Sequence, residues 1–199
     1  MPIDLLGMIL FAGAMIGTPG PANMVVMASG ARFGFRDSIP FLGGVILGKQ
    51  FIIWPLGLGL LTVLDPNGVA FLALKWMSVA YILWLAWKIA GTRIIARDAG
   101  AQPPRFVAGL IVHPLNPKAW AMVLGSLTNF TDPAANALLV TACSAAVFLS
   151  LQVVLQTIWT ILGAEIAARL AGTSREVWLM RVLAALMVIS VLYVLIRGG

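Results

Sequence analysis

The sequence has little of the chemistry on which most enzymes and metal proteins depend. It contains one cysteine, Cys143, which excludes an internal disulfide and a metal site built from several cysteines. It contains one histidine, His113, and a single histidine makes no metal site. Neither a His-Glu-x-x-His motif nor a Gly-x-Ser-x-Gly motif is present. These absences predict no metal and no cofactor, and they disfavour an enzyme.

Charge is also scarce, and this decides the class of protein. Charged residues make up 10% of the chain and hydrophobic residues 61%, with a mean hydropathy of +1.00. A soluble domain carries about 25% charged residues. The composition therefore predicts an all-α polytopic membrane protein. Its net charge of +6 comes from basic residues that flank apolar segments, so it does not indicate nucleic-acid binding.

Six apolar stretches are candidates for membrane spans. Spanning a bilayer as a helix takes roughly 20 apolar residues, and about six such spans fit this chain. The stretches are residues 3–31, 39–63, 69–92, 106–130, 134–168 and 178–196. The first carries Asp4 and lacks a preceding basic segment, so we expect a retained span and not a signal peptide. No connection is long enough to fold separately, which predicts one transmembrane domain over residues 1–199.

Basic residues lie mainly on one side of these spans. Nine follow the first, third and fifth spans: Arg32, Arg36, Lys88, Arg93, Arg97, Arg105, Arg169, Arg175 and Arg181. The other side has Lys75 and Arg197, while Lys49 and Lys118 fall inside spans. Cytoplasmic loops carry the excess of Lys and Arg, so both termini are predicted to lie outside the cytoplasm. The first three spans and the last three then enter the membrane with opposite orientations, as an inverted repeat requires.

Two proline motifs interrupt the first and fourth spans. Thr18-Pro19-Gly20-Pro21 interrupts the first, and Asn116-Pro117-Lys118 interrupts the fourth, 98 positions from Pro19 to Pro117. Proline breaks or kinks a helix, and in hydrocarbon the freed backbone groups are tolerated only against protein or a cavity. Broken helices at matching places in two halves indicate a transporter binding site. We therefore predict two inverted three-helix repeats, approximately 1–95 and 104–199, with broken first and fourth helices.

Several motifs along the chain resemble one transporter family. The Pro-Gly-Pro motif is followed by Gly34-Phe35-Arg36, Leu42-Gly43-Gly44, residues 80–85 (Ala-Tyr-Ile-Leu-Trp-Leu) and Asn116-Pro117-Lys118. In this order they resemble the lysine exporter / homoserine-threonine exporter (LysE/RhtB) family, and residues 80–90 look most like its cysteine/O-acetylserine exporters. The resemblance implies a secondary transporter of the bacterial inner membrane. It would expel small amino acids, of cysteine, O-acetylserine, homoserine or threonine type, with protons as the coupled ion.

The two breaks suit an amino-acid zwitterion. Unpaired N–H groups at a helix start attract a carboxylate, and unpaired carbonyls can receive an ammonium group. We expect substrate binding at two sets of residues near the breaks and within spans. These are Pro19, Gly20, Pro21, Asn23, Lys49, Asn116, Pro117, Lys118, Gln152 and Gln156. Gly20 is further expected to adopt a positive φ and act as a hinge.

Lys49 and Lys118 are the charged residues predicted to lie deepest in the membrane, where a charge is costly and indicates function. All seven acidic residues fall at or near span ends, so neither lysine has an evident acidic partner. Either lysine could bind the substrate carboxylate or carry the coupled proton. Lys118 could instead cap backbone carbonyls or reach the membrane surface.

Other polar and small residues can be interpreted either as structural or as functional. Gln152 and Gln156 share a helix face and either line the path or join helices. His113 favours a structural role over proton transfer. The pairs Gly13/Gly17 and Gly44/Gly48 indicate close helix packing, within the monomer or in a homodimer. The functions that compete with amino-acid export are a membrane-embedded enzyme or thiol carrier, a passive small-solute channel and a structural subunit.

Overall fold

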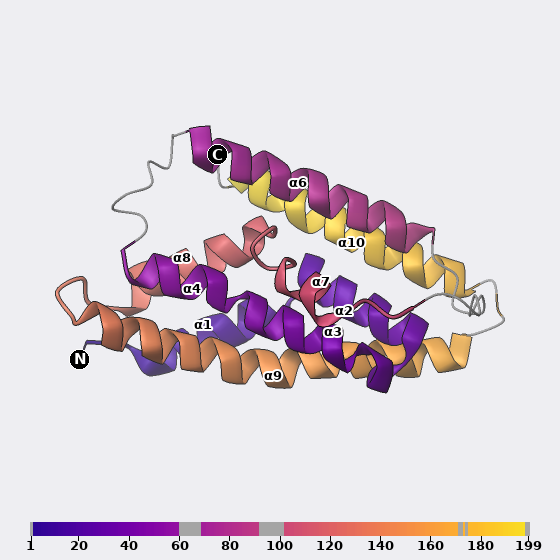
Figure 1. Cartoon of the computed structure of the whole chain (residues 1–199), viewed down its shortest axis with the longest axis horizontal. Coiled ribbons are helices and arrows are strands. Elements are labelled where there is room, and N and C mark those ends of the chain that lie inside the picture. Colours follow the sequence, from indigo (N-terminus) through magenta and orange to yellow (C-terminus); the bar gives the residue numbers. More distant parts are fainter. Residues whose placement is uncertain (1, 60–68, 92–101, 171–172, 174, 198–199) are drawn as a thin grey trace.

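The structure is a computed structural model that describes residues 2–59, 69–91, 102–170, 173 and 175–197. In this part of the chain every regular element is a helix, which confirms the predicted all-α class (Figure 1). The helices are α1 (Leu5–Gly17), α2 (Pro21–Phe33), α3 (Phe35–Gly48), α4 (Gln50–Gly57), α6 (Val69–Ala90), α7 (Phe106–Leu110), α8 (Pro117–Phe130), α9 (Ala137–Leu170) and α10 (Arg175–Arg197).

A helix break lies at each of the two proline motifs. Helices α1 and α2 meet at the first motif with a bend of 52°. A turn over residues 111–116 separates α7 from α8 at the second. Pro21 and Pro117 each occupy the first turn of the following helix, where the missing N–H removes no helical hydrogen bond. These prolines therefore begin the helix that follows each break.

The helices carry the apolar surface of a membrane protein. Phe35–Gly57 and Ala137–Leu170 are each long and apolar enough to cross a bilayer, and the bent pair α1–α2 makes a third candidate span. Large apolar side chains also face outward, for example Leu10, Phe51 and Trp87, which is 76% exposed. Exposed apolar surface on this scale fits contact with lipid. The arrangement as six spans in two repeats stays a prediction.

Helices α6 and α10 lie side by side along one edge of the molecule, opposite the long α9 (Figure 1). Helices α1 and α2 pack against α9, and α3 packs against α7. The N-terminus and the end of α10 lie at one end of the molecule, whereas α2, α6 and α9 end at the other (Figure 1).

Two apolar clusters form the core, and polar residues lie between them along the chain. One cluster involves α2, α3, α6 and α10, and the other α1, α4, α8 and the first half of α9. Lys49 lies between Ile46 of the first cluster and Ile52 of the second. Gln152 and Gln156 likewise follow Phe148 and precede the next buried apolar position of α9. The breaks and these polar residues thus share one level in the middle of the bundle, where transporter folds bind substrate.

Glycines allow two close helix crossings. A Cβ at Gly44 would overlap the Phe106 carbonyl of α7, and a Cβ at Gly163 would overlap the Met27 carbonyl of α2. Gly48 likewise faces the Leu110 carbonyl, so the packing expected for Gly44/Gly48 is confirmed. Packing within the monomer is wrong for Gly13/Gly17, because no described atom lies within 4 Å of a Cβ at either position, and their packing in a homodimer stays a prediction. Glycines four residues apart give the same pattern whether or not a partner helix is present.

Gly44→Ala is expected to destabilise the protein by about 1–3 kcal/mol, because the added methyl overpacks the α3–α7 crossing against backbone. Gly13→Ala is the matched control. It places a methyl in open space within a helix and should stabilise by roughly 0.5–1 kcal/mol. Thermal unfolding of the two purified variants in detergent measures the difference. Equal melting temperatures would show that α3 and α7 do not approach this closely.

Candidate functional site

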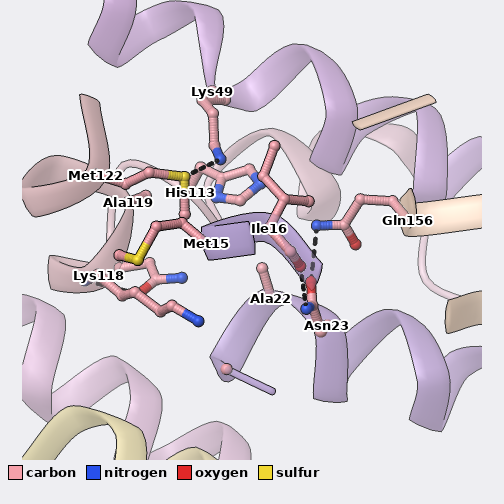
Figure 2. A pocket seen from close by; sticks show the side chains of 12 residues that line it. Met15, Ile16, Ala22, Asn23, Lys49, His113, Lys118, Ala119, Met122 and Gln156 are labelled. Atoms are coloured by element: carbon pink, nitrogen blue, oxygen red, sulfur yellow. Dashed lines mark hydrogen bonds between the residues drawn. The ribbon is translucent and has the colours of Figure 1, made fainter. Parts of the chain in front are cut away.

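A small central cavity lies where the two helix breaks meet (Figure 2). Its lining residues come from α1, α2, α8, α9, the α3–α4 junction and the turn before α8. They are Met15, Ile16, Gly20, Ala22, Asn23, Lys49, His113, Asn116, Lys118, Ala119, Met122 and Gln156. The cavity has a volume of about 20 Å³, enough for about one water molecule. We refer to it as the central cavity.

The structure brings the ten predicted site residues together around this cavity. Six line it directly: Gly20, Asn23, Lys49, Asn116, Lys118 and Gln156. The other four lie next to lining residues. Pro19 accepts a hydrogen bond from Lys118, Gln152 bonds His113, and Pro21 and Pro117 begin the helices that follow the breaks.

Lys118, from the second break, binds the backbone of the first. Its Nζ donates to Thr18 Oγ1 at 2.8 Å and to the Thr18 and Pro19 carbonyls, each at 3.2 Å. The end of α1 leaves such carbonyls without helical partners and carries the negative end of the helix dipole. The carbonyl-capping alternative for Lys118 is therefore what the structure contains. The ammonium of Lys118 occupies the position that we expected a substrate ammonium to take.

The backbone conformation of Gly20 differs from the one that the sequence predicts. Its φ is −170°, which is extended backbone, so the predicted positive φ is wrong. A Cβ at this position would come within 3.0 Å of Cδ and Nζ of Lys118. Glycine is used here because the lysine passes over the backbone and not because the chain needs a left-handed residue.

Asn23 holds the first break together from inside. Its side chain is buried, and Nδ2 donates to the Ile16 carbonyl at 2.6 Å and to the Thr18 carbonyl at 2.9 Å. Its Oδ1 accepts from Gln156 Nε2 at 3.1 Å, a link to α9 that Figure 2 shows. Asn23 thus satisfies carbonyls at the end of α1 from the first turn of α2.

Asn23→Asp is expected to lower the stability by about 1–3 kcal/mol and to impair any activity that depends on the break. The carboxylate has the same shape but cannot donate, so it would face two carbonyls with no proton to offer. Asn129→Asp is the control, since Asn129 is exposed and also donates to a backbone carbonyl. Thermal unfolding of both variants tests this. A loss at Asn129 as large as at Asn23 would contradict it.

Lys49 is the most unusual residue of the central cavity. It is 1% exposed, and its Nζ contacts Met122 Sδ at 3.3 Å and lies 5.1 Å from the centroid of the Phe148 ring. A thioether is a weak acceptor and a phenyl ring offers only a cation–π contact. No carboxylate pairs with Lys49 in the described part of the chain. A buried amine with such partners is costly, so packing alone does not explain it.

His113 and Thr18 belong to the site, although the sequence analysis did not place them among the substrate-binding residues. His113 is buried, with Nε2 at 2.7 Å from Gln152 Nε2. Thr18 contributes the shortest bond of Lys118. Both are adjacent to prolines of the breaks, and that adjacency is the signal that could have identified them.

Several buried polar atoms at this level have no hydrogen-bond partner among the described residues. They are His113 Nδ1, Gln152 Oε1 and Gln156 Oε1. Buried polar groups are nearly always paired, so these atoms are candidates to bind a ligand or water. Gln152 and Gln156 do join segments, as the structural alternative requires, yet each keeps one free oxygen.

The central cavity has groups for both charges of a zwitterion but no room for one. Among the described residues its lining contains two lysines and no acidic residue, together with helix starts and carbonyl oxygens. An amino acid is much larger than one water. Binding it would require the helices around the breaks to move apart, with Lys118 leaving the α1 carbonyls.

Comparison with known proteins identifies a family and several relatives. Residues 13–198 match the family described as LysE type translocator. A cysteine/O-acetylserine efflux protein of Escherichia coli K12 is 36% identical over 124 residues, which is 61% of this chain and 62% of that protein. Proteins of the same description from Shigella flexneri and Salmonella typhimurium LT2 are 36% and 35% identical over the same length. The aligned region thus spans less than two thirds of these relatives. No solved structure matches the chain.

Proposed function

Because the chain belongs to the family of LysE type translocators, we propose that it exports small neutral amino acids or their derivatives across the bacterial inner membrane. Relatives described as cysteine/O-acetylserine efflux proteins support this substrate class. So does the lining of the central cavity, because lysines without a nearby acid disfavour a cationic substrate.

The observation that carries the proposal is the bond between the two breaks. Lys118 Nζ, an ammonium group, is held by backbone oxygens of the first break. We propose that the ammonium group of the substrate displaces it from these oxygens. The released Lys118 then pairs with the substrate carboxylate, so both roles of a zwitterion site are filled by groups already present.

Alternating access by two inverted repeats is the motion that we propose. Helix contacts support it, because they come in corresponding pairs. Helix α1 packs on α9 as α7 packs on α3, and α2 packs on α10 as α8 packs on α6. The start of α1 and the end of α10 lie away from the ends of α2, α6 and α9 (Figure 1), whose last turns carry Arg32, Lys88 and Arg169, and this supports termini on the periplasmic side.

Proton coupling completes the proposal, with Lys49 as the residue that carries the proton. It is buried at the level of the breaks and has no carboxylate partner in the described part of the chain. Membrane-embedded ionisable groups of this kind mark proton and substrate pathways.

Flux measurements in proteoliposomes test the function. The protein is reconstituted, a panel of radiolabelled amino acids is supplied, and uptake or release is followed with and without a pH gradient. We expect saturable flux of cysteine, O-acetylserine, homoserine or threonine that the gradient accelerates. Flux that neither saturates nor responds to the gradient would indicate a passive channel. Absence of flux for every compound would exclude amino-acid export.

A further inference from the structure

A second, larger cavity lies next to the central one. It has a volume of about 380 Å³ and is bordered by α2, α3, α6, α7 and the residues just before α7. Its lining consists of Val25, Ala28, Ser29, Arg32, Phe33, Phe41, Tyr81, Trp84, Leu85, Lys88, Ile89, Gln102, Pro104, Ala108 and Ile111. Its lining includes the last residues of α2 and α6, and these two helices finish at the end of the molecule that is cytoplasmic in the proposed orientation (Figure 1). We refer to it as the Arg32 cavity.

Arg32 offers this cavity an unused donor. Its Nε is buried and has no hydrogen-bond partner among the described residues, and its guanidinium lies 5.1 Å from the Phe33 ring. No acidic residue belongs to the described lining. An arginine in this state lacks the partner that its planar fork fits best, which is a carboxylate.

Ser29 offers the same cavity an acceptor. Its Oγ lies 2.8 Å from Ser38 Oγ, and Ser38 Oγ donates to the Gly34 carbonyl. The proton between the two hydroxyls therefore comes from Ser29, which keeps its lone pairs for another donor. Ser29 and Arg32 are three residues apart on α2, a spacing that places side chains on one helix face about 5–6 Å apart at Cβ. Ser29, which can accept a hydrogen bond from an ammonium group, thus lies beside Arg32, which can donate hydrogen bonds to a carboxylate.

The two cavities follow one another along the same two segments. On α2 the central cavity ends at Asn23 and the Arg32 cavity begins at Val25. Before α8 the central cavity begins at His113 and the Arg32 cavity ends at Ile111. One residue of each segment separates them, Met24 on α2 and Val112 before α8, and both are buried. A solute in the Arg32 cavity is therefore separated from the helix breaks only by the thin wall that these residues form.

We propose that the Arg32 cavity is a second substrate site, which takes a free amino acid from the cytoplasm before it reaches the central cavity. Arg32 binds the carboxylate and Ser29 accepts a hydrogen bond from the ammonium group. The site is large enough for a small amino acid without rearrangement, which the central cavity is not. This assignment rests on the proposed function for the direction of movement, but the binding itself can be measured apart from transport.

Cysteine labelling measures this binding directly. Ala108→Cys is made in a Cys143→Ser background, since Ala108 is exposed and lines the cavity. N-ethylmaleimide labelling of the detergent-purified protein is timed with and without O-acetylserine. We expect saturating O-acetylserine to slow labelling at least about fivefold, and 2-aminoethyl acetate, which lacks the carboxylate, to have no effect. Gln102→Cys repeats the measurement from a lining residue outside the helices.

Arg32→Gln is expected to remove this protection and to raise the KM of flux about 10- to 100-fold, the loss of one charge-assisted hydrogen bond. The control Arg36→Gln changes an exposed arginine four residues later. It should keep the protection from labelling and the wild-type KM. Labelling that O-acetylserine does not slow at either position, or that Arg32→Gln leaves protected, would overturn the assignment. So would protection by phosphatidylglycerol in place of the amino acid, which would identify a lipid site. Protection without flux would instead overturn only the proposed function.

Discussion

Lys118→Met is expected to lower net export about 10- to 100-fold, while the exchange of internal for external amino acid continues once substrate is saturating on both sides, because the lost carboxylate pair raises the KM. In the empty protein the ammonium of Lys118 donates hydrogen bonds to the Thr18 and Pro19 carbonyls, just after the end of α1. Methionine has no proton to donate, and the loss of a charge-assisted hydrogen bond costs about 1.5–3 kcal/mol. The empty protein would then have to reorient with bare carbonyls in the membrane. The loaded protein would not, because the substrate brings its own ammonium group.

Two assays on the same proteoliposomes separate these steps. Net efflux into buffer without substrate requires the empty protein to return, whereas counterflow with unlabelled substrate outside does not. Lys118→Arg is the matched variant, because it keeps a charged donor at this position and should retain most of the net efflux. Equal loss of efflux and counterflow in Lys118→Met would show that the lysine binds substrate only. Normal efflux in that variant would remove Lys118 from the mechanism.

The helix breaks could be predicted from the sequence because proline acts locally. Pro19 follows the end of α1 and Pro117 begins α8, as expected for a residue that lacks a backbone donor and clashes with the preceding turn. Counting residues along the apolar stretches also predicted that Lys49 and Lys118 lie deep in their spans. The structure places both at the central cavity, and their depth in the membrane stays a prediction.

Partners across the fold could not be predicted in the same way. Lys118 bonds Thr18 over 100 positions, and Asn23 bonds Gln156 over 133. No pattern in one sequence specifies which distant polar groups meet. For the same reason the predicted set of site residues did not include His113, since its role depends on the contact with Gln152 of α9. The Arg32 cavity was missed as well, because basic residues at the ends of spans first indicate orientation.

Lys49→Met is expected to have the opposite effect on stability from Lys118→Met. Lys49 is 1% exposed and has only a thioether and a phenyl ring beside its ammonium group. Replacing it with an apolar side chain of similar length removes the cost of burying an amine and leaves no strong acceptor unpaired. The melting temperature should therefore rise by about 2–4 °C for each kcal/mol gained. Lys118→Met, which leaves carbonyls without their donor, should melt at a lower temperature than the wild type.

The same substitution is expected to uncouple transport from the proton gradient. If Lys49 carries the proton, Lys49→Met proteoliposomes will pass amino acid down its own gradient but will not accumulate it when a pH gradient is imposed. A residue that costs stability and is needed for coupling fits the trade-off between stability and activity at functional sites. Full accumulation in the variant would show that the proton travels elsewhere, with His113 as the next residue to replace. A lower melting temperature would mean that Met122 and Phe148 stabilise the lysine more than burial destabilises it.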